Sequence, residues 1–533
     1  MSEIVVDQHE VAATIGGTLH SCQKAGSVEV EAASEKSAAS AAPWFVAAVV
    51  SRYIPPMTRA KTELRTVPRP APKWQAYEAG RRLGVAAGRL LALALLGGVA
   101  CGSPLEIEMA SSALPTDNVD GSKTPVIYVP GMTGTRLSDP VDGSTVWGET
   151  RQLMRPHDGG YRLALPLLAP TQGASGAHRQ AGYQAVGPLW ELNLPGWRKP
   201  IYGPLAKHLV AAGYRLGELE KPEEHDSLFF FNYDWRRSNA ESVAALDRQL
   251  ADLAASRGGA VGVDLVCQSN AAKICRYLVK YGAQPIAIAE SVERAPAPYT
   301  VRKVVLVGAS NGGALRSLEL LLRGRSYVPV LGRRFYPETF FSIRPLFDDL
   351  PVGEGALFFD QQGDDLEVDL FDVASWQRYR WSIFSPEAEA RLAGKPRADL
   401  FGDRAQQLAY LELQLGRARR SQELLARDSA RFPAVRYYSL ENESSPTAAR
   451  ALLLGENGDW ETFFASDRKL IRRPSLLELA VAPGDGHATL ASQRALSAQE
   501  QAAMVRTVVL PGGHFEMIIA PESLDLLLEL LAD

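Results

Sequence analysis

The stretch "VDLVCQSNAAKICRYLV", Val263–Val279, decides how the rest of the sequence is interpreted. An apolar run ends at Ser269, and apolar residues at helical spacing follow at once. A serine at a strand-to-helix corner is typical of a nucleophile elbow, where the residues two before and two after must be small. Cys267 and Ala271 are small, although G-x-S-x-G would place glycine at both positions. The alternative role for Ser269 is that of an ordinary helix N-cap.

Predicted strands and helices alternate on both sides of this corner. Several of the strands are apolar throughout, which is typical of a parallel sheet covered by helices on both faces. The sequence therefore predicts an α/β fold with a mainly parallel sheet. The predicted strands lie at 124–131, 226–235, 263–269, 302–310, 434–440 and 506–514, and the helices between and after them at 202–214, 240–259, 270–282 and 521–533.

The alternation is interrupted twice. Residues 145–200 are rich in Pro, Gly and Trp and are expected to form a lid-like insertion, whereas residues 313–430 are mostly helical in pattern and are expected to form a cap. The two parts of the α/β core are then residues 124–312 and 431–533. No internal repeat is found.

The first part of the chain has a different composition. Residues 1–101 end in a basic stretch, an apolar run at Leu90–Ala100 and then Cys101, and residues 102–123 are a polar linker. A basic segment, a short apolar segment and a small-residue exit are the features of an export signal. "GVAC" resembles a bacterial lipobox, so we expect an exported protein attached to the membrane through lipidated Cys101. An uncleaved membrane anchor and a cytosolic apolar helix are the alternatives.

Composition narrows the function classes. The net charge of −4, without a dominant Lys/Arg block, gives nucleic-acid binding no electrostatic support. The eight histidines are scattered without a zinc-type motif, and we expect neither a metal nor a cofactor. Four cysteines are too few for a disulfide scaffold, and we expect Cys267 and Cys275 to be buried, unbridged residues.

An elbow serine requires a base and an orienting acid, which follow it in the order Ser…Asp/Glu…His in this fold. Asp485 lies in a Gly-flanked loop, and His514 follows the last predicted strand directly. Both are at predicted C-terminal strand ends, where open α/β sheets gather their functional groups. His487 is the competing base, but it lies only two residues from Asp485.

An oxyanion hole needs two backbone N–H groups. Asn270 directly follows Ser269 and is the first candidate donor. The second donor is expected in the loop after the first strand, where Met132 follows Pro130-Gly131.

Five motifs in this order resemble the lecithin:cholesterol acyltransferase family, which includes lysosomal phospholipase A2 and phospholipid:diacylglycerol acyltransferase. They are "PVIYVPGMTGTRL", "NYDWRRS", "LVCQSNA", "GDG" and "GGH", within residues 124–530. The resemblance implies a bacterial α/β-hydrolase with the triad Ser269, Asp485 and His514 and the oxyanion donors Met132 and Asn270. It departs from the family's elbow at Gln268, Asn270 and Ala271, and the cysteines of the family's first-lid disulfide are absent.

The functional expectation is a serine-dependent lipid acyltransferase or lipase/phospholipase. We expect it to act on a lipid or another ester at a membrane surface. Asp234 and Arg236, from the "NYDWRRS" motif, are expected to form a structural ion pair near the site. The alternative is a non-catalytic lipid-binding or scaffold protein on the same fold.

Overall fold

The computed structural model describes most of the chain after residue 122, and the segments expected to act as signal and linker, including Cys101, lie outside the described residues. The described ranges are 123–154, 156–168, 179–194, 197–291, 296–327, 333–353, 355–394, 397–456 and 458–533.

A seven-stranded sheet, in which every neighbouring pair runs parallel, forms the centre of the fold. Its order is β18-β13-β10-β9-β1-β8-β7. This order of parallel strands, with crossover helices on both faces, is that of the α/β-hydrolase fold, so the predicted fold class is confirmed. The strands are β1 (Val126–Val129), β7 (Leu216–Gly217), β8 (Leu228–Phe230), β9 (Val261–Gln268), β10 (Tyr299–Val307), β13 (Arg436–Glu441) and β18 (Met504–Val509).

Alternate residues of the inner strands pack on opposite helical layers. Val126 and Tyr128 of β1 belong to one apolar cluster, with α5 (Gly203–Ala211) and α19 (Pro521–Ala532). Ile127 and Val129 belong to the other, with α6 (Asn239–Ser256) and α7 (Ala271–Tyr281). Because both faces are covered, β1 is apolar and buried along its whole length, which explains the unbroken hydrophobic run in the sequence.

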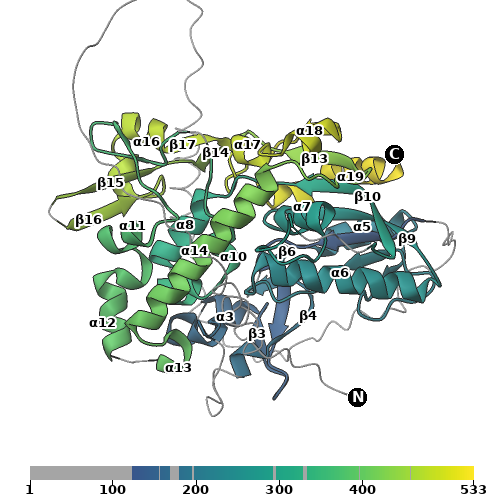
Figure 1. Ribbon diagram of the computed structural model, residues 1–533, viewed down its shortest axis with the longest axis horizontal. Helices are drawn as coiled ribbons and strands as arrows, with labels where there is room; N and C mark the ends of the chain where they lie inside the picture. Colours follow the sequence, from purple (N-terminus) through teal and green to yellow (C-terminus); the bar gives the residue numbers. More distant parts are fainter. Residues whose placement is uncertain are drawn as a thin grey trace, which may run out of the picture. The chain divides into compact units, whose positions relative to one another are not determined.

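The cap is mostly helical, and helices α11, α12 and α14 stand together to the left of the sheet strands in Figure 1. It also contains a four-stranded sheet, order β12-β11-β15-β16. Two of these strands come from 451–463, after β13 of the central sheet, so a second segment beyond residue 430 also joins the cap. The helices are α8 (Leu315–Arg323), α9 (Pro337–Phe341), α10 (Pro345–Asp348), α11 (Val373–Arg378), η3 (Ser382–Phe384), α12 (Pro386–Gly394), α13 (Ala398–Phe401) and α14 (Arg404–Ala426), and the strands are β11 (Phe358–Phe359), β12 (Asp365–Leu366), β15 (Ala451–Glu456) and β16 (Asp459–Phe463).

The lid-like insertion contains short strands that pair with one another or with β2 (Thr135–Ser138), which precedes the insertion. β3 (Thr145–Trp147) and β4 (Gln184–Pro188) flank β2, and β5 (Glu191–Leu194) pairs with β6 (Trp197–Pro200). α3 (Thr150–Met154) and η2 (His157–Leu163) lie between β3 and β4. The elements outside these groups are β14 (Ser445–Ala448), α15 (Arg468–Ile471), α16 (Pro474–Ala480), β17 (Val481–Gly484), α17 (Leu490–Gln493), α18 (Ala498–Ala502) and η4 (Glu516–Ile518).

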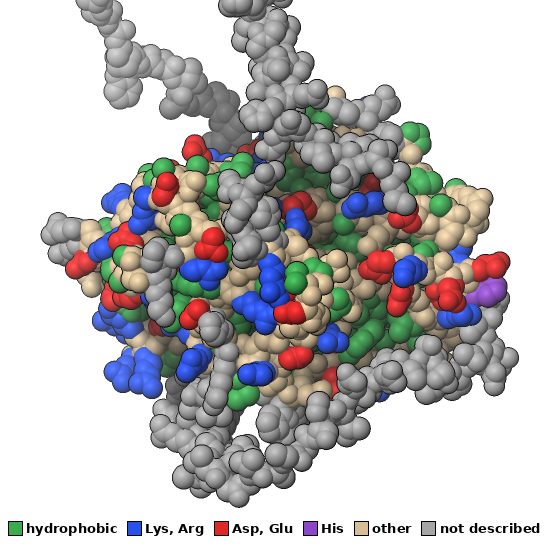
Figure 2. Space-filling model, turned by 90° about the horizontal axis from the view of Figure 1, so that it is seen from below, with side chains coloured by type: hydrophobic (Ala, Val, Ile, Leu, Met, Phe, Trp, Pro, Cys, Tyr) green, Lys and Arg blue, Asp and Glu red, His purple; other side chains and the backbone are tan. Residues whose placement is uncertain are grey.

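The face drawn in Figure 2 carries acidic and basic side chains intermingled with apolar patches, in line with the small net charge. Within the described residues, no helix combines the length and the apolar character needed to cross a membrane. The same residues contain no group of His, Cys, Asp or Glu side chains suited to holding a metal ion.

Candidate active site

Ser269 occupies a sharp corner between β9 and α7. Its φ is +56°, in the left-handed region that an ordinary L-residue avoids, at a cost of roughly 1–2 kcal/mol. The N-cap of α7 is Asn270, and its side chain makes no capping hydrogen bond. The alternative N-cap role for Ser269 is therefore wrong. Such strain collects where a side chain must be presented in one fixed position.

A disulfide bridges this corner, which corrects the prediction that Cys267 and Cys275 are unbridged. The two Cα atoms are 6.5 Å apart, and both side chains are fully buried. Cys267 is the second-last residue of β9, and α7 doubles back over the end of that strand, which brings Cys275 beside it. Two cysteines eight residues apart across a predicted strand-turn-helix were the available clue in the sequence.

Asp485 and His514 form a buried hydrogen-bonded pair. Asp485 follows β17, His514 follows β18, and the Asp485 Oδ2 atom lies 2.7 Å from His514 Nδ1. The other carboxylate oxygen accepts the backbone N–H groups of His487 and Ala488, each at 2.7 Å. Burial alone would raise the pKa of Asp485, but the charge and hydrogen bond of His514 outweigh it and lower that pKa. The carboxylate is therefore ionised and fixes the orientation of the imidazole.

The Asp485–His514 pair lies against the strand next to the serine corner. Gly308 directly follows β10, and Val307 of β10 pairs with Gln268 of β9, so Gly308 is level with Ser269. A Cβ atom on Gly308 would lie 3.1 Å from both Asp485 Oδ2 and His514 Nδ1. The glycine thus permits the pair to sit directly on the C-terminal edge of the sheet. The structure brings all three predicted residues to this edge.

His487 lies beside this pair but makes a different set of contacts. Its ring centroid is 4.6 Å from that of His514, and its backbone, rather than its ring, bonds to Asp485. Burial and then the neighbouring His514 charge lower the pKa of His487 well below its ordinary value. The ring is therefore neutral at pH 7, and it lacks the carboxylate partner that orients His514.

The two expected oxyanion donors also lie at this edge of the sheet. Gly131 directly precedes Met132, and a Cβ atom on Gly131 would lie 3.1 Å from the Ser269 Cβ atom, so the loop after β1 touches the serine corner. In the described part of the chain, the backbone N–H groups of Met132 and Asn270 have no protein acceptor. Two N–H groups without a partner beside Ser269 are what an oxyanion hole requires.

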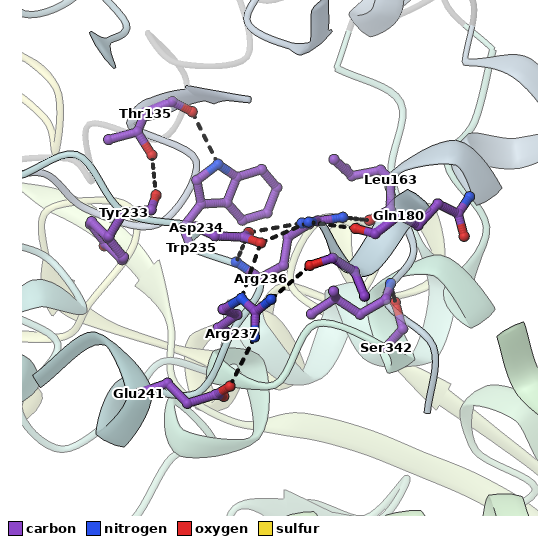
Figure 3. Close-up of polar contacts among 12 residues, drawn as sticks. Thr135, Leu163, Gln180, Tyr233, Asp234, Trp235, Arg236, Arg237, Glu241 and Ser342 are labelled. Atoms are coloured by element: carbon purple, nitrogen blue, oxygen red, sulfur yellow. Dashed lines mark hydrogen bonds and ion pairs between the residues drawn. The ribbon is translucent and has the colours of Figure 1, made fainter. Parts of the chain in front are cut away.

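Asp234 and Arg236 form the ion pair expected from the "NYDWRRS" motif (Figure 3). The Arg236 guanidinium donates to Asp234 through Nε at 2.8 Å and Nη2 at 2.7 Å. It also donates to the Leu163 carbonyl at 3.2 Å and to the Gln180 carbonyl at 3.0 Å, and both of these belong to the lid-like insertion. The pair therefore fastens the insertion to the end of β8, which is a structural role.

Comparisons with known proteins find similar chains among solved structures. No protein-family model matches this chain. No curated protein matches it either. Among solved structures, a chain of the Tle4–Tli4 complex has 14% identity and a TM-score of 0.46, over 77% of this chain and 98% of the other. Bacillus licheniformis lipase BlEst2 has 10% identity in its mature form, with a TM-score of 0.28 over 78% and 95% of the two chains. Its propeptide form has 10% identity and a TM-score of 0.26, over 78% of this chain and 52% of the other. These likenesses are too weak to establish a family.

Proposed function

We propose that this protein is a serine enzyme that breaks an ester bond of a lipid and transfers the acyl group to an alcohol or to water. The observation that carries the proposal is the Asp485–His514 pair packed on Gly308, level with the strained Ser269. A helix cap or a structural ion pair does not need a serine in the left-handed region. The resemblance to lipid acyltransferases supplies the substrate class.

In the proposed reaction, the Ser269 Oγ atom attacks the ester carbonyl carbon while its proton passes to His514 Nε2. The carbonyl oxygen becomes an oxyanion, which the N–H groups of Met132 and Asn270 stabilise. When the carbon–oxygen bond breaks, the imidazolium returns the proton to the leaving alcohol, and an acyl-enzyme remains. Water or a second alcohol then attacks the acyl-enzyme by the same steps in reverse.

Labelling with a fluorophosphonate probe tests the nucleophile. We expect one labelled peptide that contains Ser269, and none after Ser269→Ala. Incubation with a phospholipid and a long-chain alcohol together then separates free fatty acid, the product of hydrolysis, from the new ester, the product of transfer. Failure of the probe to modify Ser269 in folded protein would favour the non-catalytic lipid-binding alternative.

We propose that this enzyme acts at the cell envelope, to which lipidated Cys101 attaches it. The disulfide between Cys267 and Cys275 supports it, because disulfides persist in exported proteins and are rare in the cytosol. Intact mass of the membrane fraction from a bacterium with lipoprotein processing tests this. We expect a chain that starts at a lipid-modified Cys101 and an altered product from Cys101→Ala. Soluble protein that retains an unmodified Met1 would contradict it.

A further inference from the structure

The peptide unit between Pro130 and Gly131 is held at both of its polar ends. We propose that Tyr233 and Gln268 are positioning residues that orient this peptide and so aim the Met132 N–H at the developing oxyanion. The inference rests on the proposed function, because it concerns the oxyanion hole of that site. Neither side chain is expected to touch the reacting atoms.

The carbonyl end is held by Tyr233. Its hydroxyl donates to the Pro130 carbonyl oxygen at 2.8 Å, and its own carbonyl accepts the Thr135 hydroxyl at 2.6 Å. The Tyr233 ring stacks on Phe231 with centroids 5.1 Å apart, and its side chain is buried. Burial raises the pKa of Tyr233 far above its ordinary value, so the hydroxyl keeps its proton and remains a donor. Figure 3 shows Tyr233 joined to Thr135.

The N–H end faces Gln268, the residue before the proposed nucleophile. The Gly131 N–H donates to Gln268 Oε1 at 3.4 Å. The same oxygen accepts the Tyr202 hydroxyl at 2.6 Å and the Tyr128 hydroxyl at 3.3 Å. Burial raises the pKa of both phenols, which keeps both hydroxyls protonated. Three donors converge on one atom, so the amide of Gln268 has only one orientation that satisfies them.

Two peptide units in succession, each held by its own hydrogen bonds, place the Met132 N–H. A peptide unit is rigid, so holding its oxygen and its N–H leaves it no freedom to rotate. The following unit, Gly131–Met132, has its carbonyl oxygen bonded to the Gly134 N–H at 2.9 Å. The Met132 N–H is at the opposite end of that unit and therefore points the other way, without a protein acceptor.

Glycine at position 131 explains why such support is needed. A Cβ atom there would come within 3.1 Å of the Ser269 Cβ atom, so a small residue allows the close approach. Glycine also has the softest backbone of any residue, and a loop built on it can turn its N–H groups away. Gln268 of β9 and Tyr233, three residues after β8, supply the rigidity that the loop lacks.

Kinetics on Tyr233→Phe and Gln268→Met test the proposal. We expect each to lower kcat by about 10- to 100-fold, less than the roughly 100- to 1,000-fold loss of a whole oxyanion donor, with KM within about twofold. Because both hold one peptide, the double variant should lose less than the product of the single losses. Tyr438→Phe is the matched control, since its buried hydroxyl has no partner in the described residues, and its kcat should match wild type.

Amide hydrogen exchange at Gly131 gives a readout that does not depend on activity. We expect a protected amide in wild type and at least about tenfold faster exchange in Gln268→Met and Tyr233→Phe, because local opening becomes easier. Wild type that is inert towards esters and probe, but shows this pattern, would refute the proposed function and with it the oxyanion role, and would leave only the hold of the two side chains on the Pro130–Gly131 peptide. An active enzyme whose kcat and Gly131 exchange are unchanged in both variants would overturn the positioning role alone.

Discussion

Asp234 and Asp485 are two of the buried acids that are paired with a basic side chain, and their clusters are completed in different ways. Asp234 is paired with Arg236, whose guanidinium also donates to two carbonyls of the lid-like insertion, so each of its three nitrogens is bonded. Asp485 is also fully bonded, but its partner is not: His514 Nε2 has no hydrogen-bond partner among the described residues.

The difference distinguishes a cluster that stabilises the fold from one that can act on a substrate. A cluster in which each nitrogen and carboxylate oxygen is bonded within the protein offers little to a substrate, and it rigidifies the fold. A cluster that leaves an imidazole nitrogen, two N–H groups and a serine hydroxyl open at one place carries a cost that only a bound substrate removes. Each prediction below either breaks one of the two clusters or sharpens the contrast between them.

The largest effect is expected from the open cluster, which consists of Ser269, Asp485, His514 and the N–H groups of Met132 and Asn270. Ser269→Ala removes the attacking oxygen, and we expect ester turnover to fall by about 10⁶-fold, as loss of a triad nucleophile does elsewhere. The free energy of unfolding should not decrease, because the Ser269 hydroxyl has no partner to lose in the described chain. Turnover of a chromogenic ester and denaturant unfolding measure the two quantities. Activity within tenfold of wild type would refute the nucleophile.

The next effect concerns the base and its orienting acid. Asp485→Asn should lower the acylation rate by about 10⁴-fold, because the imidazole is then held in the wrong tautomer. His514→Ala should nearly abolish acylation, whereas His487→Ala should leave most of it, since only His514 bonds to the carboxylate. Stopped-flow acylation of folded variants measures all three rates. A dead His487→Ala beside a live His514→Ala would reverse the assignment of the base.

Breaking the closed cluster, which is Asp234 with Arg236, should lower the free energy of unfolding. Arg236→Met leaves the Asp234 carboxylate buried without its bidentate partner, and we expect a loss of about 3–5 kcal/mol in the free energy of unfolding. Urea unfolding measures it, and Asp234→Asn together with Arg236→Met should recover part of the loss. The probe should still label Ser269 in the folded fraction of Arg236→Met. Abolished labelling of folded protein would show that this cluster takes part in the reaction.

How much of this could be foreseen from the sequence depends on how local each feature is. The α/β-hydrolase fold follows from apolar strands alternating with amphipathic helices, because burial on both sheet faces leaves a continuous hydrophobic run. The positive φ of Ser269 was foreshadowed by the small residues Cys267 and Ala271. These features are encoded within a few residues of each other.

Features that depend on distant contacts were missed. The strands of 451–463 pair with a cap strand about 90 residues earlier in the chain. Strands this short show too little periodicity for the pairing to be predicted. The hydrogen bonds that hold the Pro130–Gly131 peptide come from Gln268 of β9 and from Tyr233, three residues after β8, and no spacing rule links these two residues. The disulfide was missed because a count of four cysteines argued against a scaffold, although one isolated bridge needs only two.

The disulfide at the serine corner is expected to have a moderate effect. Cys267→Ala with Cys275→Ala removes a bridge between residues eight apart, and the closed loop of that length is worth roughly 2.5 kcal/mol. Urea unfolding measures the loss. Alkylation of unfolded, unreduced wild type should find no thiol at either position. Free thiols at both in protein exported through an oxidising compartment would contradict the bridge.

The smallest effect is the pH dependence that His487 brings to the open cluster. Burial lowers the pKa of His487, and the positive charges of His514, Arg316 and Arg325 lower it further against the opposing pull of Asp485. The unfolded chain therefore takes up a proton near pH 6.5, about the ordinary histidine value, before the folded chain does. Stability contributed by the neutral ring is present above that pH and is lost as the pH falls towards the folded pKa.

His487→Gln stays neutral, so its free energy of unfolding should fall less than that of wild type between pH 7 and pH 5. The difference between the two slopes is limited to about 1.4 kcal/mol per pH unit, the value for one proton. His225→Gln, at an exposed histidine, is the matched control and should follow the wild-type curve. Denaturant unfolding at intervals of half a pH unit gives all three curves. If the His487→Gln and wild-type curves run parallel, the His487 imidazole is not held neutral by the open cluster.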